Sequence, residues 1–204
     1  MLIAITQPSL LKQEALAIEA LLKAGVDYVH VRKPGYVSEE VRALLNAVPE
    51  PGRPCLSVHY HHQAARRSGV GGLHRTKGFA VTDGKGCRVS ASCHSLAEVK
   101  ALTLADCQYV FLSPVFDSIS KKGYASAFSK ASLSEFLSHK ETDMPAVVAL
   151  GGITKDNVGA VRQMGFDGAA LLGALWVVQK GVVDVPATVE RFFEIQEQWK
   201  TVYQ

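Results

Sequence analysis

Residues 146–175, AVVALGGITKDNVGAVRQMGFDGAALLGAL, constrain the fold more than any other stretch of this chain. Two short apolar runs, 146–150 and 168–172, each end next to glycine and are separated by one segment whose apolar residues recur at helical spacing. An uncharged run of this length, bounded by glycine, is typical of a strand buried on both faces, as in a parallel sheet. Between the runs, Thr154 offers a helix N-cap and Gly165 a helix end. The stretch therefore predicts a βαβ unit.

Strand and helix signals alternate in the same way through the rest of the chain. The expected strands are residues 2–6, 27–32, 54–59, 72–74, 88–93, 108–113, 146–150 and 168–172. The expected helices are residues 13–23, 38–47 with Ser38 as its cap, 61–68, 95–102, 133–139, the segment before Gly165, and 187–199. Residues 76–86 carry three glycines and little periodicity, so we expect a loop where the fourth helix would stand.

Eight strands that alternate with helices allow either a closed β/α barrel or an open, doubly wound sheet. A doubly wound nucleotide-binding sheet carries its glycine-rich turn after the first strand, and here that place holds the glycine-free sequence QPS. The glycines instead follow the seventh and eighth strands, where β/α barrels commonly bind phosphate. We therefore predict an α/β fold, a single (β/α)8 TIM barrel over residues 1–204 with a reduced fourth helix. Its expected phosphate site consists of Gly151, Gly152, Leu172 and Gly173.

Composition narrows the class of partner. The net charge is only +3 and no basic run interleaves with aromatic residues, which argues against nucleic acid. No apolar run approaches membrane-spanning length, so we expect no membrane partner. The four cysteines are scattered without a CxxC pair, which indicates a cytoplasmic location rather than disulfides or a zinc site. The expected partners are small phosphorylated metabolites, and the oligomeric state, a homo-oligomer included, stays open.

Polar residues gather where the expected strands end, which in a β/α barrel is the end that carries the chemistry. Four of the seven histidines lie at the ends of four consecutive strands, and they are His30, His59, His74 and His94. Imidazole exchanges protons near neutral pH, so these four are candidate catalytic groups, although a lone histidine at such a place is more often a hydrogen-bonded filler. Imidazole is also a common metal ligand. Because no carboxylate accompanies the four, a magnesium site is disfavoured, and we assign no metal ligand.

Two further features supply positive charge. Arg32 shares a strand face with His30 and is a candidate anion binder, with a salt-bridged barrel arginine as the alternative. The loop after the sixth strand carries Ser118, Ser120 and Lys121, which suit a lid over a phosphate or diphosphate, although a solvated loop explains the string equally well. The residues alone therefore predict a small barrel enzyme that binds a phosphorylated metabolite. They do not define its substrate.

Six strings at the strand ends resemble the thiamine-phosphate synthase family, which includes a tautomerase branch acting on the thiazole phosphate. They are HVRK at 30–33, GLHR at 72–75, SASCHSLAEV at 90–99, YVFLSPVFDSISKKG at 109–123, VVALGGI at 147–153 and GFDGAALLGAL at 165–175. The strings occur in the family's order and span nearly the whole chain. The resemblance implies a β/α barrel that joins a hydroxymethylpyrimidine diphosphate to a thiazole phosphate, releasing diphosphate with Mg²⁺.

The resemblance also implies roles for single residues. The turns at Gly151–Gly152 and Leu172–Gly173 would hold the phosphate of the thiazole. The residues that would grip the diphosphate or belong to the closing loop are Arg32, Ser92, Ser118, Ser120 and Lys121. Ser118 and Ser120 stand where the family usually has threonine, so the hydroxyl groups are kept.

The departures from the family pattern concern the metal and the catalytic groups. Where synthases carry Gln, Arg and Lys at alternate positions after the second strand, this chain has HVRKP at 30–34. The Asn-Asp pair expected after the third strand is His59-Tyr60, and TKGF at 76–79 lacks the aspartate expected after the fourth. Both aspartates that would hold Mg²⁺ are therefore absent. The sequence leaves open whether Lys33 or Lys77 replaces the lost charge.

Three hypotheses follow. The first is a synthase-like transferase of thiamine biosynthesis, in which Arg32 and Lys121 stabilise the departing diphosphate. The second is a metal-independent thiazole-phosphate tautomerase that uses a strand-end histidine as base, although the histidine of that branch after the sixth strand is replaced here by Pro114. The third is a non-catalytic binder of thiamine phosphate that has kept the phosphate turns.

Overall fold

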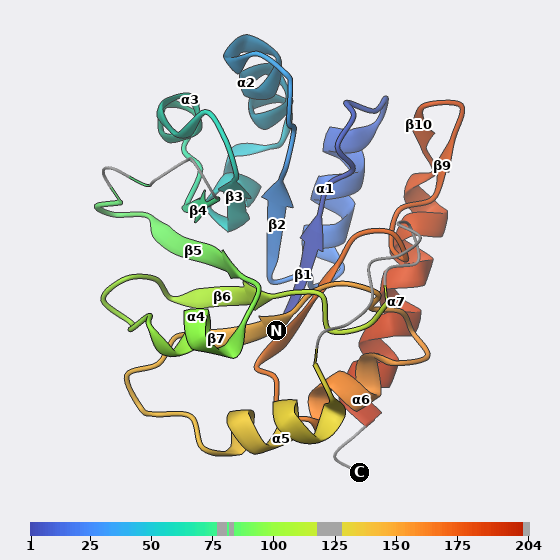
Figure 1. Cartoon of the computed structure of the whole chain (residues 1–204). Helices are drawn as coiled ribbons and strands as arrows, with labels where there is room; N and C mark the ends of the chain where they lie inside the picture. The colour runs from blue at the N-terminus through green and yellow to red at the C-terminus, as the bar shows by residue number, and fades with distance from the viewer. Residues whose placement is uncertain (77–80, 82–83, 118–127, 202–204) are drawn as a thin grey trace.

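A computed structural model describes residues 1–76, 81, 84–117 and 128–201 of the chain. Eight parallel strands close into a barrel in the order of the sequence (Figure 1). They are β1 Leu2–Ile5, β2 Tyr28–Val31, β3 Leu56–Val58, β4 Gly72–Arg75, β5 Arg88–Cys93, β6 Tyr109–Leu112, β7 Ala146–Ala149 and β8 Gly168–Leu171. β1 pairs with both β2 and β8, which closes the sheet. The predicted (β/α)8 barrel is confirmed.

Helices cover the outside of the barrel. They are α1 Glu14–Lys23, α2 Ser38–Ala47, α3 His62–Arg67, α4 Leu96–Lys100, α5 Lys130–Ser138, α6 Val158–Gln163 and α7 Val185–Thr201. α7 packs against both α1 and α6, and Figure 1 shows the three on one flank. Between β4 and β5 the described residues form no helix, as expected for a reduced fourth helix. Within the described ranges, no helix combines the length and apolar character that a membrane span requires.

The interior of the barrel is divided into an apolar half and a polar half. β1, β6, β7 and β8 fill their side with an apolar cluster that includes Ile3, Ile5, Phe111 and Val148. The strands from β2 to β5 instead bury polar side chains, and these are His30, Ser57, His74 and Ser90. A second, larger apolar layer lies between the strands and the helices. That outer layer supplies most of the apolar core, so the polar half of the interior can hold a functional site.

The third strand is shorter than predicted. Pro54 was expected to begin it, but Pro54 belongs to a 3₁₀ helix, η1, at Glu50–Cys55. Proline fixes φ and has no N–H to donate to a strand pair, so a segment with two prolines turns instead of extending. Only Leu56–Val58 pair with the neighbouring strands.

Two predicted helix caps were placed at the wrong residues. Ser38 is the first residue of α2 and not its cap, while the backbone N–H of Val37 donates to a Glu40 carboxylate oxygen at 3.0 Å. The Thr154 hydroxyl accepts a hydrogen bond from the backbone N–H of Asp156 at 3.3 Å, within a turn. The helix after this turn, α6, begins only at Val158.

A small hairpin between β8 and α7 was not predicted. Its strands are β9 Val178–Gln179 and β10 Val182–Val183, and they pair antiparallel. The two residues of the turn, Lys180 and Gly181, have φ of 48° and 76°. Positive φ at both central residues is the geometry of two-residue hairpin turns. The sequence signal for this hairpin was the dipeptide Lys-Gly within VVQKGVV at 177–183.

Candidate active site

Three of the four strand-end histidines meet inside the barrel. His30 lies on β2, His59 directly follows β3, and His74 lies on β4. Nδ1 of His30 is 3.0 Å from Nε2 of His59, and the ring centroids of His59 and His74 are 4.1 Å apart. All three side chains are buried, with at most 4% of their surface exposed. We call these three residues the histidine cluster.

Hydroxyl groups hold two rings of the cluster in place. Nε2 of His30 lies 2.6 Å from the Tyr109 hydroxyl. Nδ1 of His74 lies 2.8 Å from the Ser90 hydroxyl and Nε2 lies 2.9 Å from that of Ser92. Since a neutral imidazole has one N–H and one lone pair, a hydroxyl can serve either nitrogen by turning its hydrogen. Both ring nitrogens of His30 and of His74 therefore have a partner, which fixes the orientation of each ring.

Burial makes the cluster electrically neutral at neutral pH. It lowers the pKa of His74 to about 3, and the nearby positive charges of His62 and Arg32 act in the same direction. Burial likewise holds the pKa of His30 and that of His59 well below the usual range, with His74 as the next largest influence on both. A low dielectric disfavours the charged form of imidazole, and no carboxylate contributes to these shifts.

Acid should therefore destabilise the protein through these histidines. Each of these histidines has a lower pKa in the folded than in the unfolded chain. Its contribution to stability is therefore present above about pH 6.5 and is lost as the pH falls below that value. Through His74 alone, lowering the pH from 7 to 5 is expected to reduce the free energy of unfolding by about 2 kcal/mol. Urea unfolding at both pH values, with EDTA present, measures the loss.

A matched pair of variants tests the source of this acid sensitivity. His74→Asn should show a smaller loss between pH 7 and pH 5 than the unsubstituted protein. His139→Asn, which removes an exposed histidine at the end of α5, should show the same loss as the unsubstituted protein. Equal losses in all three proteins would contradict the assignment to His74.

His94 does not join the cluster. It follows the last residue of β5 and is exposed, because the alternation of the strand ends at Cys93. Its backbone N–H donates to a Glu98 carboxylate oxygen at 2.5 Å, and its Nδ1 lies 3.1 Å from the carbonyl oxygen of Ser113. The predicted wall of four histidines is thus a buried cluster of three and a separate surface residue, whose catalytic role stays a prediction.

The glycine turn after β7 leaves no room for side chains. Gly151 and Gly152 have φ of 98° and 65°, in the region that favours glycine. A Cβ on Gly152 would lie 2.5 Å from the carbonyl oxygen of Asp117, and one on Gly151 would lie 2.9 Å from Cα of Pro114. The backbone of this turn therefore packs directly against the loop that follows β6.

Asn157 fixes the same turn from the helix side. Its Nδ2 donates to the carbonyl oxygen of Gly152 at 2.8 Å, and its Oδ1 accepts from the backbone N–H of Thr154 at 2.9 Å. Sequence reasoning missed this residue, although an asparagine just before a helix was a usable signal. Leu172 and Gly173 lie in the turn after β8, the strand that pairs with β7. The two expected phosphate turns are therefore neighbours.

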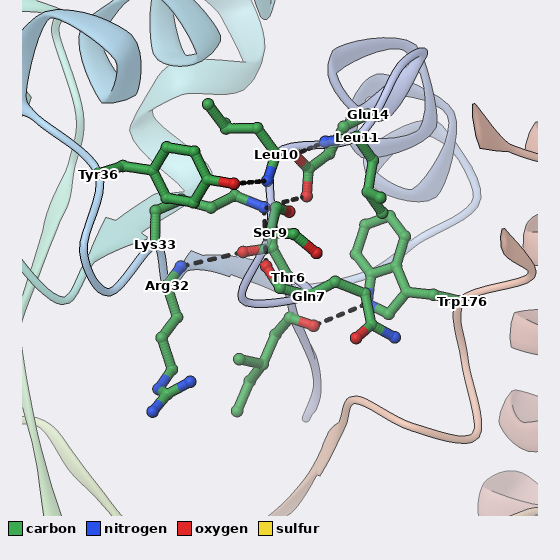
Figure 2. A network of polar contacts seen from close by, with 11 residues as sticks. Thr6, Gln7, Ser9, Leu10, Leu11, Glu14, Arg32, Lys33, Tyr36 and Trp176 are labelled. Atoms are coloured by element: carbon green, nitrogen blue, oxygen red, sulfur yellow. Dashed lines mark hydrogen bonds and ion pairs between the residues drawn. The ribbon is translucent and has the colours of Figure 1, made fainter. Parts of the chain in front are cut away.

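Arg32 is half-buried at the end of β2, and a polar network holds its backbone. Its backbone N–H donates to the Thr6 hydroxyl at 3.0 Å, and Figure 2 shows the guanidinium pointing away from this network. In the same network the Tyr36 hydroxyl accepts from the backbone N–H of Leu10 at 3.1 Å. The indole of Trp176, in the segment after β8, donates to the carbonyl oxygen of Ile5 at 2.7 Å. The loop after β1 is thereby tied to both neighbouring strands.

Lys33 forms the centre of this network and does not replace a lost charge at the barrel mouth (Figure 2). Its Nζ donates to the carbonyl oxygens of Gln7 and Ser9, each at 2.7 Å, and lies 2.5 Å from a carboxylate oxygen of Glu14. Both charged side chains are at most 1% exposed. Burial raises the pKa of Glu14 and lowers the pKa of Lys33, and each shift is opposed by the charge of the partner.

The other predicted site residues divide into two groups. Ser92 is half-buried with its hydroxyl against His74, so it belongs to the edge of the histidine cluster. The candidate lid residues Ser118, Ser120 and Lys121 lie outside the described residues, and so does Lys77. Sequence reasoning did not single out Tyr109, whose polar ring at the start of an otherwise apolar strand was the available signal.

Comparisons with known proteins identify the family. The profile described as thiamine monophosphate synthase matches residues 2–175. The chain belongs to the thiamine-phosphate synthase family. A thiamine-phosphate synthase of Limosilactobacillus fermentum is 34% identical over 194 residues, covering 87% of this chain and 86% of that protein.

Solved structures agree with this assignment. A thiamine phosphate pyrophosphorylase from Bacteroides thetaiotaomicron superposes with a TM-score of 0.84 at 28% identity, covering 100% of this chain and 99% of that one. A thiamine phosphate pyrophosphorylase from Pyrococcus furiosus, 21% identical, has a TM-score of 0.72 over 97% of this chain and 96% of that one, and supports the fold.

Proposed function

We propose that this member of the thiamine-phosphate synthase family is a transferase that joins a hydroxymethylpyrimidine diphosphate to a thiazole phosphate. The observation that carries the proposal is the turn after β7. Its backbone at Gly151 and Gly152 is held between Asn157 and the loop after β6, with no space for a side chain. Turns of this kind at the last strands of a β/α barrel bind phosphate through backbone N–H groups.

The proposed reaction needs positive charge where the diphosphate departs. The bond between the hydroxymethyl carbon of the pyrimidine and the diphosphate oxygen breaks, and its electron pair leaves with the diphosphate. The lone pair of the thiazole nitrogen forms the new bond to that carbon. Arg32 would supply a cation near the expected phosphate turns. Its strand, β2, is separated from β8 by β1 alone. Ser92, Ser118 and Ser120 would donate hydrogen bonds to the diphosphate, and Lys121 would add a second charge.

Magnesium does not fit the residues at the family's metal positions. Mg²⁺ takes oxygen ligands in near-octahedral geometry, usually one or two carboxylates with water and substrate oxygens. Here His59 and Tyr60 follow β3, Thr76 follows β4, and the side chains that converge are imidazoles. We therefore assign the neutralisation of the diphosphate to Arg32 and Lys121 instead of magnesium.

The tautomerase is the second candidate, and the histidine cluster does not favour it. A general base works best when its pKa is near the working pH, whereas burial lowers the pKa of His74 to about 3 and holds those of His30 and His59 well below the usual range. Neutral imidazoles of this kind are weak bases. The third candidate, a non-catalytic binder of thiamine phosphate, shares the phosphate turns and differs only in turnover.

Replacing Arg32 tests the proposed role of its charge. Arg32→Ala is expected to lower kcat/KM for thiamine phosphate formation by about 10²–10³-fold, because one preorganised donor at a developing charge has an effect of that size. Arg42→Ala, which removes an exposed arginine on α2, should leave kcat/KM unchanged. Equal rates for the two variants would remove Arg32 from the mechanism.

The assay itself separates the three candidates. The protein is incubated with both substrates, with chelator or with added divalent cations, and the products are quantified. Absence of thiamine phosphate at high protein concentration in every condition would overturn the transferase. Tight thiamine phosphate binding in calorimetry would then support the binder, and isomerisation of the thiazole carboxylate phosphate would support the tautomerase.

A further inference from the structure

We propose that His30, His59 and His74 form a binding site for one divalent transition-metal ion, such as Zn²⁺ or Co²⁺. One ring nitrogen from each residue lies within 4.8 Å of the others, and the three come from neighbouring strands of the barrel. Three imidazoles are a ligand set for zinc and its neighbours, whereas magnesium requires oxygen. The cluster would thus take a different class of metal from the Mg²⁺ that the resemblance to the family implies.

The distances are close to those of an occupied site. Tetrahedral zinc, bound at about 2.0–2.1 Å, holds its nitrogen ligands roughly 3.4 Å apart. Nδ1 of His30 and Nε2 of His59 are 3.0 Å apart, so a small outward movement of either ring would admit the ion. The nitrogen of His74 would have to approach by at most roughly 1.4 Å. In the metal-free protein a hydrogen bond between His30 and His59 occupies the same space.

Outer hydrogen bonds are compatible with the tautomers of His30 and His74 that a metal needs, and the ion would displace the hydrogen that His59 and His30 share. If His30 donates from Nε2 to the Tyr109 hydroxyl, its Nδ1 keeps a lone pair facing His59. If His74 donates from Nδ1 to the Ser90 hydroxyl, its Nε2 keeps a lone pair, which receives the Ser92 hydrogen in the metal-free protein. Histidines that bind metals usually donate their other N–H to such a partner. Tyr109 and Ser90 are therefore positioning residues for this site.

The charge around the cluster predicts the fourth ligand. No carboxylate belongs to the cluster, while Arg88 acts electrostatically on His30 and Arg32 acts on His59 and His74. A zinc-type ion with three protein ligands keeps a fourth position for water or substrate, and three neutral ligands together with nearby positive charge favour an anion there. We infer that an oxygen of the diphosphate fills this place beside Arg32. This last step rests on the proposed function, whereas the metal site itself does not.

Cobalt titration of the full-length, chelator-treated protein tests the site. We expect a single Co²⁺ per chain with the visible absorption of a tetrahedral nitrogen-ligated ion, displacement by Zn²⁺, and no response to Mg²⁺. Ser90→Ala should weaken Co²⁺ binding by about 10–100-fold, the usual effect of losing an outer partner. His59→Asn should weaken it further, and His94→Asn, which changes an exposed residue just after β5, should bind as the unsubstituted protein does.

Several outcomes would overturn the proposal. Absence of stoichiometric Co²⁺ or Zn²⁺ binding by the unsubstituted protein is one, and undiminished binding by both Ser90→Ala and His59→Asn is another. Circular dichroism checks that His59→Asn folds, and if it does not, Ser90→Ala decides. Inorganic diphosphate should tighten Co²⁺ binding by about tenfold or more, since a shared ligand couples the two affinities reciprocally. An unchanged affinity would remove the diphosphate as fourth ligand.

The transferase activity and the metal site are tested independently of each other. Metal binding without formation of thiamine phosphate would overturn the transferase and leave the metal site standing. Formation of thiamine phosphate in a protein that binds no transition metal would overturn the metal site and leave the transferase standing.

Discussion

Glu14→Gln is expected to lower the free energy of unfolding by about 3–5 kcal/mol, the usual effect of removing one partner of a buried ion pair. The substitution keeps the shape of the side chain and removes its charge. The ammonium group of Lys33, only 1% exposed, would then keep two carbonyl partners and lose its only counter-ion among the described residues. Urea unfolding at neutral pH measures the change.

A surface pair on the same helix provides the control. On α1, Glu19, which is half-buried, pairs with the exposed Lys23, so Glu19→Gln is expected to change the free energy of unfolding by less than about 1 kcal/mol. The double variant Glu14→Leu with Lys33→Met should recover much of the lost stability, because it removes both charges together. If Glu14→Gln were as mild as Glu19→Gln, the buried pair would not hold the loop after β1.

Gly152→Ala is expected to weaken both the fold and the proposed phosphate site. The new Cβ would lie 2.5 Å from the carbonyl oxygen of Asp117 and 2.8 Å from Cβ of Phe116, at a φ of 65°. The left-handed conformation costs about 1–2 kcal/mol, and displacing packed backbone adds about 1–3 kcal/mol. Because the turn itself must move, we expect affinity for thiamine phosphate to fall by about tenfold or more, measured by calorimetry.

Gly181→Ala separates the cost of the left-handed backbone conformation from the cost of the steric contact. Gly181 has a similar φ of 76°, but a Cβ there would meet no atom within 4 Å. This variant should lose only the conformational part, about 1–2 kcal/mol, and should bind thiamine phosphate with unchanged affinity. Equal loss of stability in the two variants would show that the contact of Gly152 with the loop after β6 is unimportant.

The periodicity of the chain was sufficient for most of the fold. Buried parallel strands such as β7 and β8 are short apolar runs that glycine ends, and such runs are readable without tertiary information. The errors came where local chemistry was misjudged. Pro54 was assigned to a strand, although proline has no N–H to donate to a neighbouring strand. Ser38 was predicted to be the N-cap of α2, although the N-cap is Val37. Each error displaced an element boundary and left the topology unchanged.

The candidate site was less accessible from the sequence. His30 and His74 were correctly located near the ends of their strands, but the alternation of β5 was extended one residue too far at His94, where the strand has already ended. Tyr109 lies 79 residues from His30 along the chain, and no local pattern relates the two. Lys33 resembled a mobile replacement charge until its contact with Glu14 was known.

The sequence by itself determined the barrel and the two glycine turns after its last strands, because periodicity and glycine positions are properties of single segments. Only the tertiary structure decided which polar residues meet. It joined three histidines with Tyr109 and the β5 serines, excluded His94, and paired Lys33 with Glu14. The physical reason is that the closure of the barrel sets distances between strands, and burial then sets the protonation of the groups brought together.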